Sequence, residues 1–398
     1  AAFNLTGDKE MIIPTRGFEV SEYENRLNKI QKLMFESKMD VILLTTQVDI
    51  EYYTGFKTQF FQSPTRPWYV LIPASGKPQA IIPTIGESGM RETWVDDIKT
   101  WTSPNPKDDG ISILLSSINS LTKTHKCLGV PKTLESTLRM PLGDYEYLIN
   151  ALNGIEIKDA NKILRKVRFV KSAAEIAKIK HICQLTSQGF IDLEGFLKAG
   201  ESERENCKRF KQHLLSLGAD DTPYIVSGSG QEGYGSIIMG PTEKIIEEGD
   251  LFIIDTGSVF DSYFCDFDRN YAFGHIGDEA KKAYRVAYDA TEAGFNAAQV
   301  GNTTSDIFNA MNDILQKGGA LGNTVGRLGH GLGMQLTEWP SNTSTDNTVL
   351  EPGVVLTLEP GMAFLPGKEM VHEENIVITE NGPEWLSIRA ADELPIIQ

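Results

Sequence analysis

The sequence has few cysteines, no long apolar run and a shortage of positive charge. Its four cysteines show no CxxC spacing, which argues against a zinc knuckle or a disulfide framework and favours reduced, structural thiols. No apolar stretch approaches the roughly 20 residues of a membrane-spanning helix. Lys and Arg number 38 against 54 Asp and Glu, a net charge of −16. Nucleic acid and anionic membranes are therefore not expected as partners, because both bind basic faces.

What is present suits a globular enzyme with two domains. The 398 residues are 40% hydrophobic, enough for two cores. From about residue 20 to 160, helical patterns alternate with short apolar runs, and a basic stretch at 160–171 then interrupts the pattern. We predict domains at 1–160 and 161–398. The opening AAFNLTGDKE lacks the charged and apolar regions of a signal peptide, so a cytoplasmic location is expected.

The second half reads as helices combined with a mainly antiparallel sheet. Three helix starts carry a hydroxyl residue followed three positions later by an acid, the pattern of a capping box: Ser172 with Glu175, Ser202 with Glu205, and Thr303 with Asp306. Strand-like runs (YIVS, LFIID, NYAF, VVLTL and NIVIT) lie between and after the helices. The expected fold class is α/β in the broad sense, more strictly α+β.

Five acid or imidazole side chains lie in or beside these apolar runs. Unpaired buried carboxylates are costly unless a positive group lies among them, and two divalent cations would supply it. Oxygen donors with one imidazole suit Mn, Fe, Co or Zn. The five predicted metal ligands are Asp255, Asp266, His330, Glu359 and Glu374.

A hairpin would bring the two aspartates together. Asp255 and Asp266 could meet if a tight turn through Gly257 and Ser258 joined two strands. Taken alone, an Asp before a Gly is more often a turn residue, so the metal interpretation depends on the whole set. The GSGQEG run at 228–233 has dinucleotide-binding spacing, but no helical pattern follows it, which argues against a nucleotide site.

The aromatic segment 52–69 admits two interpretations. Dense aromatics usually form a core. Tyr52, Trp68 and Tyr69 could instead face a cationic substrate group, and Pro64 and Pro67 favour a loop there.

The order Asp, Asp, His, Glu, Glu with the motifs DTG, GHGLG and LEPG resembles the pita-bread metallopeptidase superfamily. That superfamily contains prolidase, aminopeptidase P, methionine aminopeptidase, creatinase and some dimethylsulfoniopropionate lyases. The resemblance implies a creatinase-like domain at 1–160, a pita-bread catalytic domain at 161–398, and two divalent ions. Asp255 and Asp266 would bind one ion and bridge, His330 and Glu359 would bind the other, and Glu374 would bridge. It also implies a homodimer in which segment 52–69 completes the neighbour's pocket.

Two departures from the resemblance bear on the substrate. Peptidases of this kind carry a histidine seven residues after the metal histidine, where this chain has Thr337, and another in the segment that here reads GYGSIIMGP. Losing such donors would cost a peptidase on the order of 10²–10³ in rate.

The first hypothesis is therefore a lyase that cleaves dimethylsulfoniopropionate, a small charged metabolite, to acrylate and dimethyl sulfide. Asp268 or Glu338 would be the base, and the predicted substrate contacts are Tyr52, Trp68, Tyr69, Thr337, Trp339 and His372. The alternative is a prolidase-like hydrolase of Xaa-Pro dipeptides, in which Glu359 or Glu374 assists proton transfer. A third hypothesis is a binding protein that carries no metal.

Overall fold

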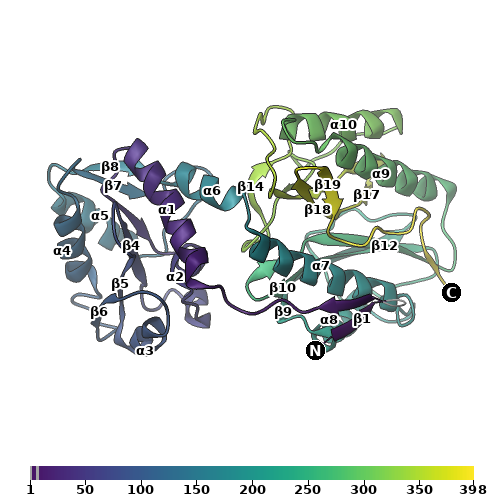
Figure 1. Ribbon diagram of the computed structural model, residues 1–398. Coiled ribbons are helices and arrows are strands. Elements are labelled where there is room, and N and C mark those ends of the chain that lie inside the picture. The colour runs from purple at the N-terminus through teal and green to yellow at the C-terminus, as the bar shows by residue number, and fades with distance from the viewer. Residues whose placement is uncertain (1, 6–8) are drawn as a thin grey trace. The chain divides into compact units, whose positions relative to one another are not determined.

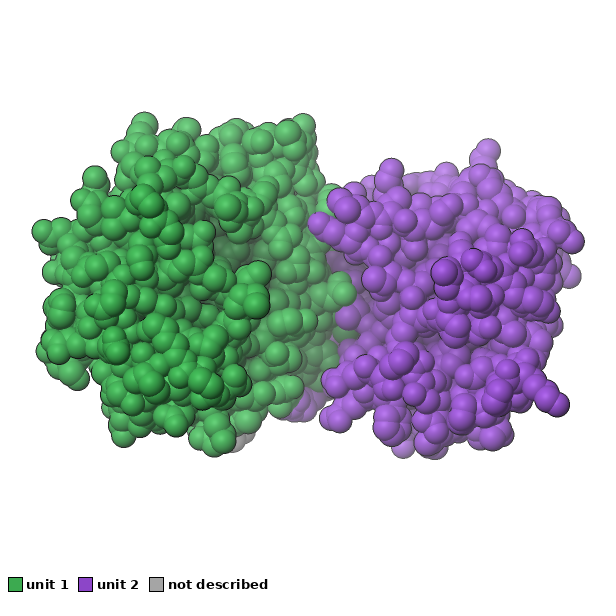
Figure 2. Space-filling model, turned by 180° about the vertical axis from the view of Figure 1, so that it is seen from behind, with its two compact units in different colours: residues 1–14, 169–398 green, residues 15–168 purple. Residues whose placement is uncertain are grey.

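The computed structural model describes residues 2–5 and 9–398 and divides into two compact units. Unit 1 comprises 1–14 and 169–398, and unit 2 comprises 15–168; the two are coloured separately in Figure 2. The units divide between Arg168 and Phe169, at the end of the helix Asn161–Phe169. The predicted domain boundary after residue 160 placed this helix in the second domain instead. Among the described residues, no helix has the length and apolarity needed to cross a membrane.

Unit 2 is a mixed sheet with helices around it (Figure 1). The strand order is β6-β5-β4-β3-β7-β8, with antiparallel pairing in the centre and parallel pairing toward both edges. The strands are β3 (Val41–Leu44), β4 (Tyr69–Pro73), β5 (Gln79–Pro83), β6 (Asp97–Trp101), β7 (Cys127–Val130) and β8 (Glu156–Asp159). The helices are α1 (Val20–Glu36), α2 (Gln47–Thr54), α3 (Glu87–Arg91), α4 (Ile111–Leu121), α5 (Leu142–Ala151) and α6 (Asn161–Phe169), with short 3-10 turns at Gln59–Gln62 and Thr84–Gly86.

Unit 1 has strands between two helical layers (Figure 1). Helices α7 (Ala173–Leu193) and α8 (Glu203–Leu217) pack on one sheet, and α9 (Asp278–Ala297) with α10 (Thr304–Lys317) covers the other strands. The first sheet contains β9 (Asp221–Gln231), β10 (Asp250–Phe260), β11 (Tyr263–Phe264), β12 (Phe267–Phe273) and β20 (Ile396–Ile397). The second contains β13 (His330–Gly331), β14 (Glu338–Ser341), β15 (Val355–Leu358), β18 (Glu374–Thr379) and β19 (Gly382–Trp385).

Two hairpins complete unit 1, namely β1 (Ala2–Leu5) with β2 (Lys9–Ile12), and β16 (Gly361–Leu365) with β17 (Lys368–Val371). Among the described residues of this unit, β12 and β20 pair in parallel and all other strand pairs are antiparallel. The predicted fold class, with a mainly antiparallel sheet in the second half, is confirmed.

The predicted helix starts lie where the capping patterns place them. The Ser172 hydroxyl accepts a hydrogen bond from the Glu175 amide, and the Glu175 carboxylate accepts one from the Ser172 amide. Thr303 and Asp306 form the same reciprocal pair at the start of α10. Ser202 caps the start of α8, and Gly218, with a φ of +117°, directly follows its last residue. GSGQEG runs out of β9 with no helix after it, which removes the structural basis for a dinucleotide site.

The hairpin between the two aspartates exists, but its turn lies further along the chain than predicted. Gly257 and Ser258 lie inside β10, beside a shift in its pairing with β9. The chain reverses at Asp261 and Ser262, whose φ values of +46° and +71° suit a two-residue turn between β10 and β11.

Candidate metal centre

The β10–β12 ladder places three aspartates on one face of the first sheet. Asp255 pairs directly with Asp268. Asp266 precedes Asp268 by two residues, and because side chains alternate along an extended chain, both point to the same side. The residue between them, Phe267, and the next, Arg269, point to the other side.

His330 is presented at the start of β13 by a glycine-rich loop. Gly329 has a φ of +109°, and a Cβ there would lie 2.2 Å from the Thr357 carbonyl oxygen, so only glycine fits. The His330 amide donates to the Thr357 hydroxyl at 3.1 Å. Its Nδ1 lies 2.7 Å from the Gly331 carbonyl, and its Nε2 lies 3.1 Å from Asp266. A proton on Nδ1 that is donated to the carbonyl leaves the Nε2 lone pair available for a metal.

Two glutamates come from the second sheet. Leu358 pairs with Glu374 in the β15–β18 ladder, so the residues one step outward, Glu359 and Glu373, face each other across the same two strands. Both glutamates point to the face that carries His330.

Six side chains therefore converge in two overlapping groups. One group contains Asp266, His330 and Glu373, and the other contains Asp255, Asp268, Glu359 and Glu373. Within each group, one ligand atom from every residue lies within 4.8 Å of the others. Four carboxylate oxygens of the cluster are buried with no hydrogen-bond partner among the described residues: Asp255 Oδ1, Asp268 Oδ2, Glu373 Oε1 and Glu373 Oε2.

The buried carboxylates of the cluster need bound cations to neutralise their negative charge. Burial first, and then the neighbouring Asp266 and Glu359 charges, raise the pKa of Asp255 well above its usual range. Burial and the Asp255 charge do the same to the pKa of Asp268, and burial and Asp266 do so to that of Glu373. Carboxylates held this close are stable in the charged form only with divalent ions among them. The orphaned oxygens and the single imidazole fit Mn, Fe, Co or Zn.

The prediction for Glu374 needs correction, because its carboxylate lies outside both groups. It accepts hydrogen bonds from Arg269 at 2.9 Å, Ser387 at 2.8 Å and the Ala390 amide at 2.9 Å. Burial alone would raise the pKa of Glu374, but Arg269, His372 and Arg389 lower it below the usual range. The adjacent Glu373 takes the place in the cluster that Glu374 was expected to fill.

Glu338, one of two predicted bases, is held by a buried lysine. Lys171 Nζ lies 3.0 Å from Glu338 Oε2, and the Gln335 amide donates to Oε1. Both charged side chains are buried. The Glu338 carboxylate is therefore engaged by other protein groups and does not line the pocket described below.

Three predicted substrate contacts near the second sheet also lie outside that pocket. His372 is buried between the rings of Tyr284 and Tyr288, and its Nε2 lies 3.3 Å from Glu374. Trp339 packs on Phe169 with ring centroids 5.0 Å apart. Thr337 is half-buried, and none of the three is among the pocket-lining residues.

The aromatic residues of unit 2 form core contacts. Tyr52, Trp68 and Tyr69 expose at most 2% of their surface. The Arg26 guanidinium lies 4.1 Å from the Tyr52 ring centre, and Trp68 packs against Phe56 and Phe61. The expected cage for a cationic substrate group is therefore wrong for these side chains, which are enclosed by their own unit.

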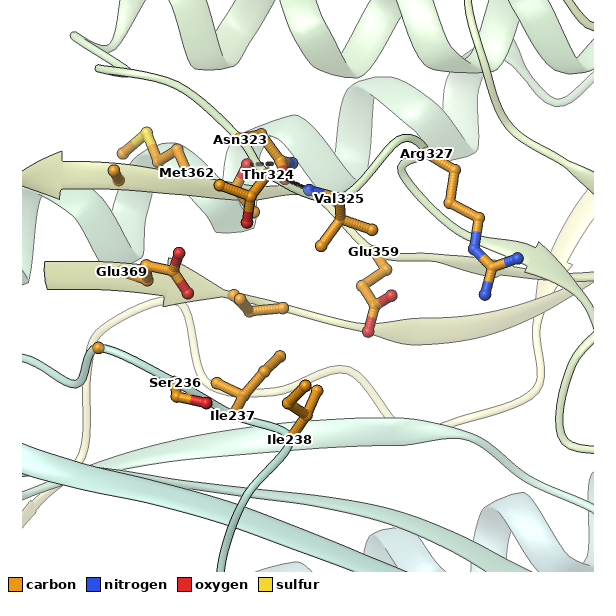
Figure 3. A pocket seen from close by; sticks show the side chains of 14 residues that line it. Ser236, Ile237, Ile238, Asn323, Thr324, Val325, Arg327, Glu359, Met362 and Glu369 are labelled. Carbon is orange, nitrogen blue, oxygen red and sulfur yellow. Dashed lines mark hydrogen bonds between the residues drawn. The ribbon is translucent and has the colours of Figure 1, made fainter. Parts of the chain in front are cut away.

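A pocket of about 330 Å³ opens beside the cluster (Figure 3). Glu359 belongs to both the pocket and the cluster. Arg327 is the one Lys or Arg among the pocket-lining residues and donates to the Ser341 hydroxyl at 3.2 Å. In Figure 3, Arg327 and Glu369 lie at opposite ends of the pocket. Apolar side chains fill much of the remaining wall: Ile237, Ile238, Val325, Met362 and Val371.

Sequence reasoning missed Glu373, Arg327 and Lys171. The run His-Glu-Glu-Asn offers two adjacent glutamates, and only the strand register separates their roles. No local sequence signal connects Lys171 to Glu338, because the two meet through the fold.

Similarity to known proteins fits this geometry. The model of metallopeptidase family M24 matches residues 177–380, more than half of the chain. The chain belongs to metallopeptidase family M24. The Creatinase/Prolidase N-terminal domain matches residues 26–170, so the expected superfamily is confirmed. Membership of family M24, together with the cluster, makes the protein a metal-dependent enzyme of a hydrolase family.

Two curated relatives align with this protein over almost its whole length. An uncharacterised peptidase of Bacillus subtilis is 27% identical and covers 90% of this chain and 96% of its own. The Xaa-Pro dipeptidase of Pyrococcus horikoshii is 25% identical, over 91% of this chain and 96% of its own.

Solved structures show how widely this fold occurs. The prolidase of Thermococcus sibiricus has a TM-score of 0.85 at 23% identity and covers 96% of this chain and all of its own. The N-terminal domain of the FACT complex subunit SPT16 from chickpea reaches 0.77 at 16% identity, covering 95% and 99%. Such different proteins share the fold, so the chemistry of this M24 member depends on its site.

Proposed function

We propose that the protein is a metal-dependent hydrolase of small peptides, of the Xaa-Pro dipeptidase type. The observation that carries the proposal is a cluster of five carboxylates and one imidazole at the wall of a pocket with a single guanidinium. Family membership and the names of the relatives favour amide hydrolysis over the lyase reaction. The burial of Tyr52 and Trp68 and the pairing of Glu338 remove three supports of the lyase hypothesis.

The pocket suits a dipeptide with two charged ends. Arg327 has two guanidinium nitrogens, Nε and Nη2, with no hydrogen-bond partner among the described residues, and a carboxylate can accept from them. Glu369 at the other end can bind an α-ammonium group. The apolar wall between them can accept a proline ring or an aliphatic side chain.

Glu359 is positioned to transfer a proton during hydrolysis of the amide bond. It is the cluster carboxylate that also lines the pocket, so it can take a proton from water and deliver it to the leaving nitrogen. Two divalent ions, when bound, would lower the pKa of water and polarise the amide carbonyl. Asp255, Asp266, His330, Glu359 and Glu373 would hold them.

The two missing histidines predict a slow peptidase. The segment that would carry one of them supplies Ile237 and Ile238 to the pocket wall, and the position of the other is Thr337. Apolar side chains cannot donate to a developing oxyanion, so we expect turnover on the order of 10²–10³ below that of an enzyme that keeps such donors.

The test compares substrates and metals. Protein loaded separately with Mn, Fe, Co or Zn is given free Xaa-Pro dipeptides, other dipeptides and dimethylsulfoniopropionate, with Asp266→Ala as the inactive control. Cleavage of Xaa-Pro dipeptides by the wild type alone supports the proposal. Release of dimethyl sulfide without dipeptide cleavage overturns it.

A homodimer and a cytoplasmic location remain part of the proposal. The four cysteines are unpaired, as a reducing compartment favours. Sedimentation across a concentration series, with activity measured in parallel, tests the dimer; a fully active monomer contradicts it.

A further inference from the structure

We propose that Asp268 is itself a metal ligand, and that it adds a further carboxylate to one of the two metal positions and so strengthens the binding of a hard ion such as Mn²⁺ there. The inference uses the two-ion centre of the proposed function but not its substrate. It is therefore tested by metal binding, whose outcome is independent of peptide cleavage.

The position of Asp268 is that of a ligand. It pairs directly with Asp255 across the β10–β12 ladder and belongs to the group that also contains Glu359 and Glu373. Its side chain is completely buried. The Oδ1 atom accepts a hydrogen bond from the Glu373 amide at 3.0 Å, which fixes the carboxylate, while Oδ2 has no partner among the described residues. One oxygen is thus held and the other is presented to the cluster.

No Lys or Arg forms an ion pair with the Asp268 carboxylate among the residues that the structure describes, and the Arg269 charge does not offset the rise in the pKa of Asp268 that burial and the neighbouring acids cause. Arg269 is the adjacent residue, but its guanidinium donates to the Asp268 and Glu373 carbonyl oxygens, to the Glu374 carboxylate and to the Ile388 carbonyl. Those bonds engage it away from the Asp268 carboxylate. A buried, unpaired acid oxygen is costly, and coordination of a divalent ion would remove that cost.

The alternative role for Asp268, that of a base acting on substrate, does not fit. A base must come within hydrogen-bond reach of the substrate proton. Asp268 is not among the pocket-lining residues, whereas Glu359 is. Asp268 can reach an ion in the cluster without touching the substrate.

The two metal positions differ chemically, and Asp268 belongs to only one of them. The group with Asp266 and Glu373 includes the His330 imidazole, a donor that suits Zn, Co or Fe. The group with Asp268 offers carboxylate oxygens alone, the donor set that Mn²⁺ and Mg²⁺ favour. Removal of Asp268 should therefore weaken one position and leave the other unchanged.

The experiment is a calorimetric titration of chelator-treated, dialysed protein with Mn²⁺. Asp268→Asn keeps the size of the side chain and an acceptor for the Glu373 amide. The matched control is Asp250→Asn, a buried acid on the same strand as Asp255 that is paired with Lys244 and lies outside the cluster. The wild type and the control should bind two ions per chain, and Asp268→Asn should bind one with unchanged affinity and the second about 10- to 100-fold more weakly.

A second variant and a stability measurement distinguish a lost metal site from a misfolded protein. Asp268→Ser also removes the charge and keeps a hydroxyl acceptor, and thermal unfolding of the metal-free variants identifies any that are misfolded. Wild-type protein carrying one equivalent of Zn²⁺ should bind one further Mn²⁺, seen by electron paramagnetic resonance, and a folded Asp268 variant should bind it about 10- to 100-fold more weakly. Two Mn²⁺ ions bound to the folded variants with wild-type affinity would overturn the proposal.

Discussion

Glu373 and Glu374 are adjacent in the chain, yet their carboxylates serve two separate sets of partners. Glu373 joins both metal-ligand groups, whereas Glu374 binds Arg269, Ser387 and the Ala390 amide. Alternation along the strand accounts for the separation, because a shift of one residue turns a side chain to the other face. One glutamate therefore belongs to the metal centre and its neighbour to the structure that supports it.

The two glutamates predict opposite phenotypes. Glu374→Gln should destabilise the metal-free protein by about 3–5 kcal/mol, because it leaves buried Arg269 without its countercharge. Glu373→Gln should leave the stability of the metal-free protein unchanged or higher, because it removes one of several repelling acids, but it should abolish binding of two ions. Urea unfolding and metal analysis of both variants check this. A stable Glu374→Gln that has lost its metals would restore the original assignment.

The Lys171–Glu338 pair predicts a loss of stability rather than of chemistry. Both side chains are nearly completely buried and their charged atoms are 3.0 Å apart. Removing either partner should cost about 3–5 kcal/mol, since a buried charge is left alone. A double-mutant cycle with Lys171→Met and Glu338→Gln should show strong coupling, and folded Glu338→Gln should keep activity within about tenfold of wild type. Complete loss of activity in a stable Glu338→Gln protein would make Glu338 a catalytic base after all.

Capping patterns in the sequence predicted where helices of unit 1 begin, because such patterns involve only neighbouring residues. A capping box involves residues three apart, so Ser172 with Glu175 and Thr303 with Asp306 could be identified without knowledge of the fold. Three predicted ligands, Asp255, Asp266 and Glu359, lie in the cluster and were chosen because an acid within an apolar run is costly to bury unless a cation neutralises it. The fourth, His330, was chosen with them as the one imidazole of the set.

The errors came from features that depend on register or on distant contacts. The turn was placed at Gly257 because glycine is the common turn residue, but Asp261 and Ser262 adopt the positive φ values. Trp68 was considered a substrate contact because it lies in a dense aromatic segment that Pro64 and Pro67 suggested was a loop, whereas its ring is enclosed by aromatic side chains of the same unit. Neither outcome follows from the residues alone, since each is decided by packing.

Arg327 predicts a specificity test within the proposed reaction. Arg327→Gln should raise KM for free dipeptides by about 10- to 100-fold with little change in kcat, because a hydrogen bond to a charged group contributes roughly 1.5–3 kcal/mol. The matching dipeptide amides, which lack the carboxylate, should be hydrolysed by the variant and the wild type with similar KM. An equal loss with both substrates would mean that Arg327 acts on the metal centre through Asp266 instead.

The cysteines predict how the protein responds to alkaline pH. Burial raises the pKa of Cys207 and of Cys265 to about 12, and raises that of Cys183 as well. The unfolded chain ionises its thiols near pH 8.5, so their contribution to stability is intact below that pH and declines as the pH rises toward 12. Native protein at pH 8 should react slowly with a thiolate-directed reagent, and urea-unfolded protein should react at all four cysteines. Rapid reaction of the native thiols would contradict their burial.

Metal removal should destabilise the protein because the cluster repels itself. Burial and neighbouring acids raise the pKa values of Asp255, Asp268 and Glu373, so the metal-free centre keeps these acids charged only at a cost in free energy. Divalent ions that bind the folded form alone stabilise it by about 2.7 kcal/mol at a free concentration 100 times their Kd. Thermal unfolding with added Mn²⁺ should therefore shift to higher temperature as the ion concentration rises, and a chelator should reverse the shift. The same titration with Asp266→Ala should give a smaller shift, since that variant loses an acid of the His330 group. An equal shift in both proteins would place the stabilising ion somewhere other than this cluster.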